Sequence, residues 1–216
     1  MEIFLASASP EDIEKAYQLP ISGVLTNSSI LEKERKSLKD LVAAVDLIGD
    51  LPFGLQIAST QEPEMMEEFY LFQSLVKKRL LHLKIPYCLD AFKIVNNVRN
   101  LGIKTNLTGI STLAQACVAL EADIDYLSIY VGRVTDAGDD GLRLLAEIKK
   151  YALSMQKKTK ILAASIRNLE HFEEVIRLGA DAVAIPYTLL IESLHSETTG
   201  KSISGFKESW KRIDQR

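Results

Sequence analysis

The sequence predicts an α/β fold, a (β/α)8 TIM barrel that forms a single domain over residues 1–216 and ends in an additional C-terminal helix. The chain has 216 residues, close to the length that one α/β barrel needs. Short apolar runs that favour strands alternate with longer segments of helical periodicity, in eight pairs. Alternating units of about 27 residues require parallel strands with helical crossovers, and they favour a closed barrel.

A doubly wound open sheet is the alternative fold. Such a sheet normally carries a glycine-rich phosphate turn after its first strand. Neither G-x-G-x-x-G nor G-x-x-x-x-G-K-[ST] occurs in the sequence, so the barrel is favoured.

The predicted elements follow one another along the chain, with helices in the intervals between strands. The predicted strands are Glu2–Leu5, Gly23–Thr26, Gly54–Ala58, Leu81–Ile85, Lys104–Thr108, Tyr126–Tyr130, Lys160–Ala164 and Ala182–Ile185. The first helix begins after Ser9, because a capping serine followed by Pro10 and two acidic residues is a typical helix start. Gly102 and Gly179 each follow a helical stretch and precede a strand, where glycine commonly ends a helix.

The last predicted helix spans residues 202–214. It places Ile203, Phe206, Trp210 and Ile213 at helical spacing, and this apolar stripe contains the only tryptophan of the chain. The stripe needs a surface to cover. Packing on its own barrel and docking on a neighbouring subunit are both open at this point.

Composition indicates an ordinary soluble protein, with 47% hydrophobic and 25% charged residues. The net charge of −3, without a dense basic stripe, argues against nucleic acid as a partner. No leader and no apolar run of about 18 residues is present, so no membrane association is expected. Two cysteines, Cys88 and Cys117, are too few for a disulfide framework, and a cytoplasmic location is expected. The three histidines lack metal-ligand spacing, so no metal is expected.

Barrel enzymes carry their chemistry where strands end at the carboxyl face. Polar residues at or just after the predicted strand ends are therefore the candidate site residues. They are Thr26, Asn27, Gln56, Lys84, Thr108, Tyr130, Arg133, Ser165 and Arg167.

Lys84 is the lysine that lies near a carboxyl end, whereas Lys104, Lys158 and Lys160 lie at or before amino ends. Period-two alternation places Lys84 on the same face as His82, and this face points into the barrel. Burial disfavours the ammonium and lowers the pKa of such a lysine, and a neutral amine is a nucleophile toward carbonyls. The alternatives are a lysine that reaches solvent or one that pairs with a carboxylate.

The other candidates suggest supporting functions. Gln56, Thr108 and Tyr130 project from three strands and could hold a water that relays protons, or each could satisfy an interior hydrogen bond. Arg133 and Arg167 follow consecutive strands, and Arg167 lies where barrels commonly bind phosphate. Solvated loop arginines are the alternative.

Several segments together resemble one family. They are MEIFL at 1–5, GVLTNSSI at 23–30, GLQIAS at 54–59, LKIP at 83–86, GIKTNLTGISTLAQA at 102–116, YVGR at 130–133 and ILAASIRN at 161–168. The chain resembles the small transaldolases and, among them, the fructose-6-phosphate aldolase type. The resemblance implies that Lys84 is the Schiff-base nucleophile. It also implies that Asn27 and Ser165 bind the dihydroxyacetone unit, and that the two arginines bind phosphate. Thr26, beside Asn27 at the strand end, is a further candidate for substrate binding.

Residues at the barrel mouth also bear on the subfamily. By the resemblance, fructose-6-phosphate aldolases carry glutamine and tyrosine where transaldolases tend to have glutamate and phenylalanine, and this chain has Gln56 and Tyr130. The chain departs from the family at Ala6, where an aspartate that assists proton transfer is expected, and at Ser28, where the family has proline. Loss of a positioned acid or base typically costs roughly a hundredfold in rate or more.

The sequence thus predicts a class I aldolase of carbohydrate metabolism and the pentose phosphate pathway. It would interconvert fructose 6-phosphate with dihydroxyacetone and glyceraldehyde 3-phosphate, without a metal or organic cofactor. The alternatives are a transaldolase that transfers the dihydroxyacetone unit between sugar phosphates, and a phosphosugar-binding barrel whose activity is weak or lost because of Ala6. The resemblance further implies a homo-oligomer, a pentamer or decamer.

Overall fold

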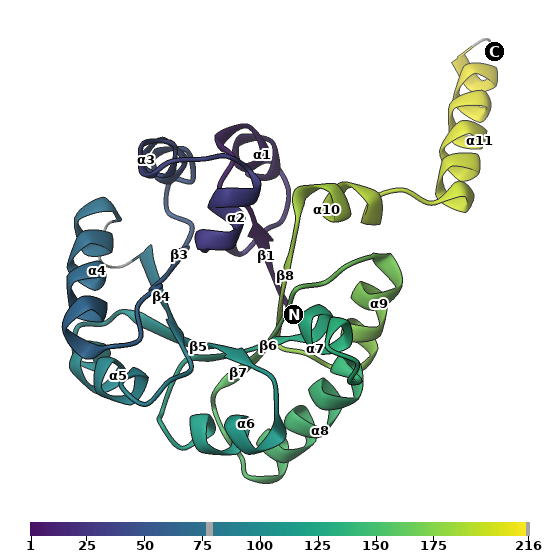
Figure 1. Cartoon of the computed structure of the whole chain (residues 1–216). Coiled ribbons are helices and arrows are strands. Elements are labelled where there is room, and N and C mark those ends of the chain that lie inside the picture. The colour runs from purple at the N-terminus through teal and green to yellow at the C-terminus, as the bar shows by residue number, and fades with distance from the viewer. Residues whose placement is uncertain (77–79, 215–216) are drawn as a thin grey trace.

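The computed structural model describes residues 1–76 and 80–214 of the chain (Figure 1). Its eight parallel strands close into a barrel in chain order, as the sequence predicts. The strands are β1 Glu2–Ala6, β2 Gly23–Leu25, β3 Phe53–Gln56, β4 Leu81–Pro86, β5 Lys104–Ile110, β6 Tyr126–Tyr130, β7 Lys160–Ala164 and β8 Ala182–Ile185.

The helices form a ring outside the barrel (Figure 1). In the described residues they are α1 Pro10–Ala16, α2 Ser28–Lys33, α3 Leu38–Leu47, α4 Glu62–Leu75, α5 Ala91–Arg99, α6 Leu113–Leu120, α7 Val131–Asp136, α8 Gly141–Ser154, α9 Leu169–Arg177, α10 Tyr187–Ser193 and α11 Glu197–Asp214. Ser9 caps α1 and accepts a hydrogen bond from the Asp12 amide, with Pro10 in the first turn. Gly102 and Gly179 both have φ +72°, so the predicted helix ends are confirmed.

Five strands differ from their predicted bounds because pairing with neighbouring strands, rather than local composition, sets where they begin and end. β1 ends at Ala6 instead of Leu5, and β4 ends at Pro86 instead of Ile85. β2 ends at Leu25, and β3 runs from Phe53 to Gln56 instead of over Gly54–Ala58. β5 continues to Ile110 through an irregularity in its pairing with β6, where Gly109 takes a left-handed φ of +85°.

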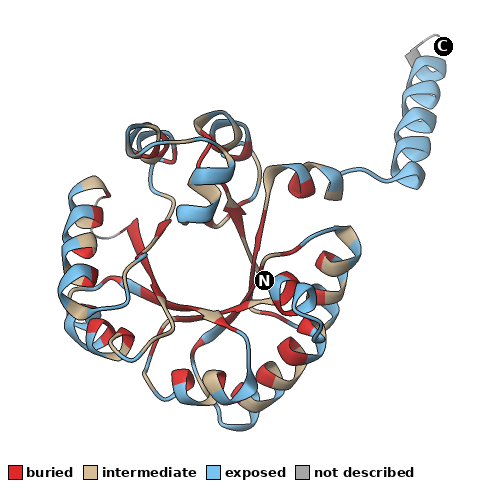
Figure 2. Ribbon diagram, viewed as in Figure 1, coloured by how far each residue is buried: buried red, intermediate tan, exposed pale blue. Residues whose placement is uncertain are grey.

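Two apolar layers hold the barrel, and Figure 2 shows the buried faces of the helices turned toward the strands. The larger layer lies between strands and helices, and the smaller lies inside the barrel. The interior layer comprises Phe4, Leu25, Tyr126, Leu162, Ala164, Ala182 and Ala184. The large rings of Phe4 and Tyr126 fill the amino half, whereas alanines occupy the carboxyl ends of β7 and β8. Small side chains at that end leave room for a cavity.

Helix α11 points away from the barrel (Figure 1). Ile203, Phe206, Trp210 and Ile213 are 47%, 71%, 69% and 64% exposed. Packing of this stripe on its own barrel, one of the two expectations, is therefore not seen. The helix also begins earlier than predicted, at Glu197 instead of residue 202, because Ser196 accepts hydrogen bonds from the first turn and Glu197 pairs with Lys201 at 2.5 Å.

Over the described residues, none of the helices has both the length and the apolar character needed to cross a bilayer.

His82 lies inside the amino half of the barrel and is 7% exposed. Its ring is 6.0 Å from that of Phe4 and 5.5 Å from that of Tyr126. Burial lowers the pKa of His82 to about 4, although the carboxylates of Asp125 and Glu2 partly oppose the shift. His82 is thus a neutral core residue at physiological pH.

This low pKa makes stability depend on pH. An unfolded histidine takes up a proton near pH 6.5, whereas folded His82 does so only near pH 4. The free energy of unfolding should therefore fall as pH drops through this window, by about 3 kcal/mol from pH 7 to pH 4. Urea unfolding of the parent and of His82→Phe at both pH values measures the contribution. Equal pH dependence in the two chains would contradict it.

Candidate active site

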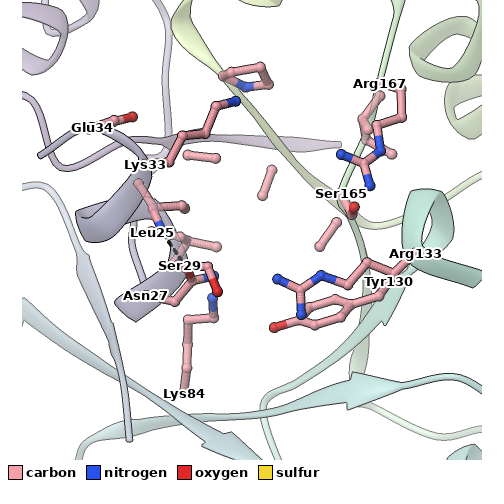
Figure 3. Close-up of a pocket in the computed structure, with 16 residues that line it drawn as sticks. Leu25, Asn27, Ser29, Lys33, Glu34, Lys84, Tyr130, Arg133, Ser165 and Arg167 are labelled. Carbon is pink, nitrogen blue, oxygen red and sulfur yellow. Dashed lines mark hydrogen bonds between the residues drawn. The ribbon is translucent and has the colours of Figure 1, made fainter. Parts of the chain in front are cut away.

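A cavity of about 230 Å³ opens at the carboxyl end of the barrel (Figure 3). Small side chains at the ends of β1, β7 and β8, namely Ala6, Ala164 and Ala184, line part of it. Its polar lining consists of Asn27, Ser29, Lys33, Glu34, Lys84, Tyr130, Arg133, Ser165 and Arg167. Six of the nine sequence candidates thus share one cavity, because parallel strands bring their carboxyl ends to the same face.

Lys84 enters the cavity from β4 and points toward its centre (Figure 3). The residue is 5% exposed. Burial, and to a smaller extent the positive charge of Arg133, lower the pKa of Lys84 from 10.5 to about 8. Within residues 1–76 and 80–214, its ammonium has no hydrogen-bond or ion-pair partner. Lys84 therefore neither reaches solvent nor pairs with a carboxylate, and a substantial fraction of its amine is neutral near pH 8.

Tyr130 and Gln56 are joined across the cavity side of the barrel. The Tyr130 hydroxyl donates a hydrogen bond of 3.2 Å to the Gln56 side-chain oxygen. Gln56 lies directly beside Lys84 in the register of β3 and β4. The phenol of Tyr130, the amide of Gln56 and the amine of Lys84 are therefore neighbours on the inner surface of the barrel.

Thr108 and Thr26 are buried, and neither is among the residues that line the cavity. Both side-chain hydroxyls lack a hydrogen-bond partner among the described residues. A buried polar atom normally has a partner, so these two hydroxyls are exceptions. Gln56, the third candidate outside the cavity lining, contacts the cavity through Tyr130.

Asn27 has a structural task as well as a place in the cavity. Its side-chain oxygen caps α2 by accepting a hydrogen bond of 2.8 Å from the Ile30 amide. The side-chain NH2 group of Asn27 is left to contact a ligand. Ser28 forms the first turn of this helix, so the residue that replaces the expected proline does not prevent the cap.

A close contact at Gly132 brings together the loops that follow β6 and β7, which carry several candidate site residues. The Gly132 amide donates to the Ser165 carbonyl at 3.1 Å, and a Cβ on Gly132 would lie 2.1 Å from that oxygen. Ser165 itself has a φ of +62°, which is uncommon for serine and frequent at functional sites. Glycine at 132 therefore allows the two loops to approach, which brings Ser165 and the neighbouring arginines to one side of the cavity (Figure 3).

The two arginines have different environments. The Arg133 guanidinium lies over the Tyr130 ring, 4.5 Å from its centre. Arg167 forms an ion pair with Asp136 at the end of α7. Both arginines line the cavity together with Lys33 and Lys84, so four basic side chains and the carboxylate of Glu34 surround it.

Sequence reasoning missed Ser29, Lys33 and Glu34, which also line the cavity. They belong to α2 and its C-terminal end, and Figure 1 shows α2 closer to the barrel axis than the other helices near it. The prediction considered residues directly at strand ends, whereas the tilt of a helix over the mouth depends on tertiary packing. The sequence signal that could have indicated these residues was the short spacing between the end of β2 and the capped start of α2.

Ala6 leaves the end of β1 without a carboxylate. In the described lining of the cavity, the carboxylate present is that of Glu34. It accepts hydrogen bonds from the Ala8 amide at 2.7 Å and the Ser7 hydroxyl at 3.1 Å. Glu34 thus fastens the end of α2 to the loop after β1. No cluster of three potential metal ligands is found in the part of the chain that the structure describes.

Comparison with known proteins places the chain among relatives of full length. Residues 3–215 match the family described as Transaldolase/Fructose-6-phosphate aldolase. A probable transaldolase of Moorella thermoacetica is 33% identical over 217 residues and is covered, like this chain, at 100%. A probable transaldolase of Carboxydothermus hydrogenoformans is 35% identical over 214 residues, with 99% of both chains covered.

Solved structures agree on the fold. The N-acetylmannosamine-6-phosphate 2-epimerase of Clostridium perfringens superposes with a TM-score of 0.62 at 15% identity, with 87% of each chain covered. At that identity the likeness concerns the barrel alone. The full-length match and the relatives at 33% and 35% identity mean that this chain belongs to the transaldolase/fructose-6-phosphate aldolase family.

Proposed function

We propose that this protein is a class I aldolase that cleaves or forms fructose 6-phosphate through a Schiff base on Lys84. Family membership supports an enzyme of aldolase or transferase type. The observation that carries the proposal is a buried lysine without an acidic partner among the described residues, which points into the cavity and has a pKa of about 8. An amine of this kind can attack a ketone without first losing a proton to a strong base.

The proposed reaction begins when the neutral Lys84 nitrogen adds to the C2 ketone of fructose 6-phosphate. Loss of water gives an iminium. The C4 hydroxyl then passes its proton to the water held by Tyr130, Gln56 and Thr108, the C3–C4 bond breaks, and glyceraldehyde 3-phosphate leaves. The electron pair of the broken bond enters the enamine on Lys84. Protonation of this enamine at C3 and hydrolysis of the iminium release dihydroxyacetone and the free amine.

The surrounding groups support these steps by their positions. Tyr130, Gln56 and Thr108 are assigned to hold the water that protonates the enamine and hydrolyses the iminium. The hydroxyls of the dihydroxyacetone unit are assigned to Asn27, Thr26 and Ser165, and the phosphate to Arg133 and Arg167. The positive charge around the cavity favours a substrate that carries phosphate.

The chemistry is tested by trapping. Borohydride added with dihydroxyacetone or fructose 6-phosphate should reduce the iminium and leave a stable adduct on the Lys84 peptide, located by mass spectrometry. Lys84→Met should lose this adduct and more than about a thousandfold of the turnover. Lys158→Met, which removes an exposed lysine far from the cavity, is the matched control. Labelling of another lysine in the parent chain would contradict the assignment.

Transaldolase is the second candidate, because the curated relatives are named probable transaldolases. Both reactions share the Lys84 enamine and differ in its fate. Transfer requires an enamine that waits for an acceptor aldehyde, whereas cleavage requires its protonation. The hydrogen-bonded pair of Tyr130 and Gln56 supplies a phenol near the enamine, and this supports cleavage.

Replacement of the phenol should change the balance between these reactions. Tyr130→Phe is expected to lower the release of free dihydroxyacetone by roughly tenfold or more, because one proton donor is lost. Transfer to an added acceptor aldehyde should fall much less. Coupled assays with and without acceptor measure both rates. A parent chain that turns over only with acceptor present would favour transaldolase instead.

Ala6 motivates a candidate of another class, a barrel that binds phosphosugars with weak or lost turnover. The end of β1 offers a methyl group where the family expects a carboxylate, and the Glu34 carboxylate is held by Ser7 and Ala8. Trapping at Lys84 without steady-state release of glyceraldehyde 3-phosphate would support this candidate. Release at a measurable steady rate supports the aldolase.

We further propose that α11 docks on a neighbouring subunit of a homo-oligomer. Its apolar stripe of Ile203, Phe206, Trp210 and Ile213 is exposed along a helix that stands away from its own barrel (Figure 1). Exposure of so many large apolar groups on one face is typical of an interaction surface. Five or ten subunits, the sizes that the family resemblance implies, are expected.

Sedimentation analysis tests this docking. The parent should sediment as a closed oligomer, and Trp210→Glu should shift it toward smaller species because a charge enters the apolar contact. Ser204→Glu adds the same charge away from the stripe and should leave the mass unchanged. A monomeric parent, or equal dissociation in both variants, would exclude docking through this face.

A further inference from the structure

We propose that Lys33 is a third cation of the phosphate subsite and determines the preference for phosphorylated over unphosphorylated substrates. The inference rests on the proposed function and assigns a group that the sequence did not indicate. Lys33 lines the same cavity as Lys84 but belongs to the last turn of α2. Figure 3 shows its ammonium extended over the cavity, on the side opposite Arg167.

Lys33 keeps its charge free although acidic residues lie nearby. Glu34, its neighbour in sequence, directs its carboxylate to Ser7 and Ala8. Glu11 forms an ion pair with Lys36, at 3.3 Å, and not with Lys33. Lys33 therefore has no ion-pair or hydrogen-bond partner within the described chain.

The backbone that carries Lys33 is fastened at both ends. Asn27 caps the start of α2, and Glu34 ties its end to the loop after β1. Arg35 then takes a left-handed φ of +54°, and the Lys36 amide donates back to the Leu31 carbonyl at 2.9 Å. These contacts hold the base of the Lys33 side chain at the rim of the cavity.

A third cation suits the charge of a phosphate bound in this subsite. A phosphate ester carries about two negative charges near pH 7. Arg167 already shares its charge with Asp136, and Arg133 lies over the Tyr130 ring deeper in the cavity. Lys33 supplies an uncompensated charge on the opposite side of the mouth, where it can donate hydrogen bonds to phosphate oxygens.

The test uses the full chain and inorganic phosphate as the probe, measured by titration calorimetry. Lys33→Met should raise the phosphate concentration for half-saturation roughly tenfold, as the loss of one charged hydrogen bond predicts. Lys33→Arg should restore most of the affinity. Lys39→Met, which removes an exposed lysine of α3 outside the cavity, should match the parent. Equal phosphate affinity in Lys33→Met and Lys39→Met would overturn the proposal.

Borohydride trapping at Lys84 tests the second part of the proposal, the preference for phosphorylated substrates. In Lys33→Met, the half-saturating concentration of fructose 6-phosphate should rise much more than that of dihydroxyacetone, which has no phosphate. An equal rise for both would overturn the proposal, since it would show a general disturbance of the site. If the parent traps neither compound but Lys33→Met still loses phosphate affinity, Lys33 is supported and the aldolase function fails.

Discussion

The removal of water from one ammonium group is the constraint on which this site depends. Lys84 is placed inside a ring of strands where its charged form is poorly solvated, so its pKa falls to about 8. A carboxylate partner would reverse this effect by stabilising the ammonium, and among the described residues none contacts it. Arg133 adds a repulsive positive charge instead. The chemistry of the site follows from this arrangement of burial and charge.

The sizes of the interior side chains of the barrel keep Lys84 buried and still leave a cavity above it. Phe4, Tyr126 and His82 pack against one another in the amino half, with Phe4 edge-on to Tyr126, and close it to solvent. At the carboxyl end, alanines take the place of large residues, and the space they leave becomes the cavity above Lys84. Gly132 has a corresponding function between the loops, where the missing side chain lets Ser165 and the arginines converge.

Much of this was predictable because it depends on local patterns. Alternation along β4 fixed the direction of Lys84, and the recurrence of strand and helix predicted the barrel. The boundary of β3 was missed because its register is set by its partners in the sheet. Lys33 and Glu34 were missed because they reach the cavity only through the tilt of α2. The direction of α11 likewise depends on contacts that composition does not reveal.

Two features of the chain have opposite effects on the proposed aldol cleavage. The pairing of Tyr130 with Gln56 supports protonation of the enamine, whereas Ala6 removes a group expected to assist bond cleavage. Ala6 bears on the rate of bond cleavage, whereas Tyr130 and Gln56 bear on the fate of the enamine. In the proposed reaction, the intermediate begins to form at Lys84, because the first step requires a neutral amine within reach of a ketone.

The most direct test of the account is therefore the titration of the Lys84 amine itself. NMR of the ligand-free chain with isotopically labelled lysine, with the resonance assigned by its loss in Lys84→Met, gives the midpoint. A midpoint near pH 8 is expected from the burial of the amine. A midpoint near 10.4, the value of an exposed lysine, would contradict the account.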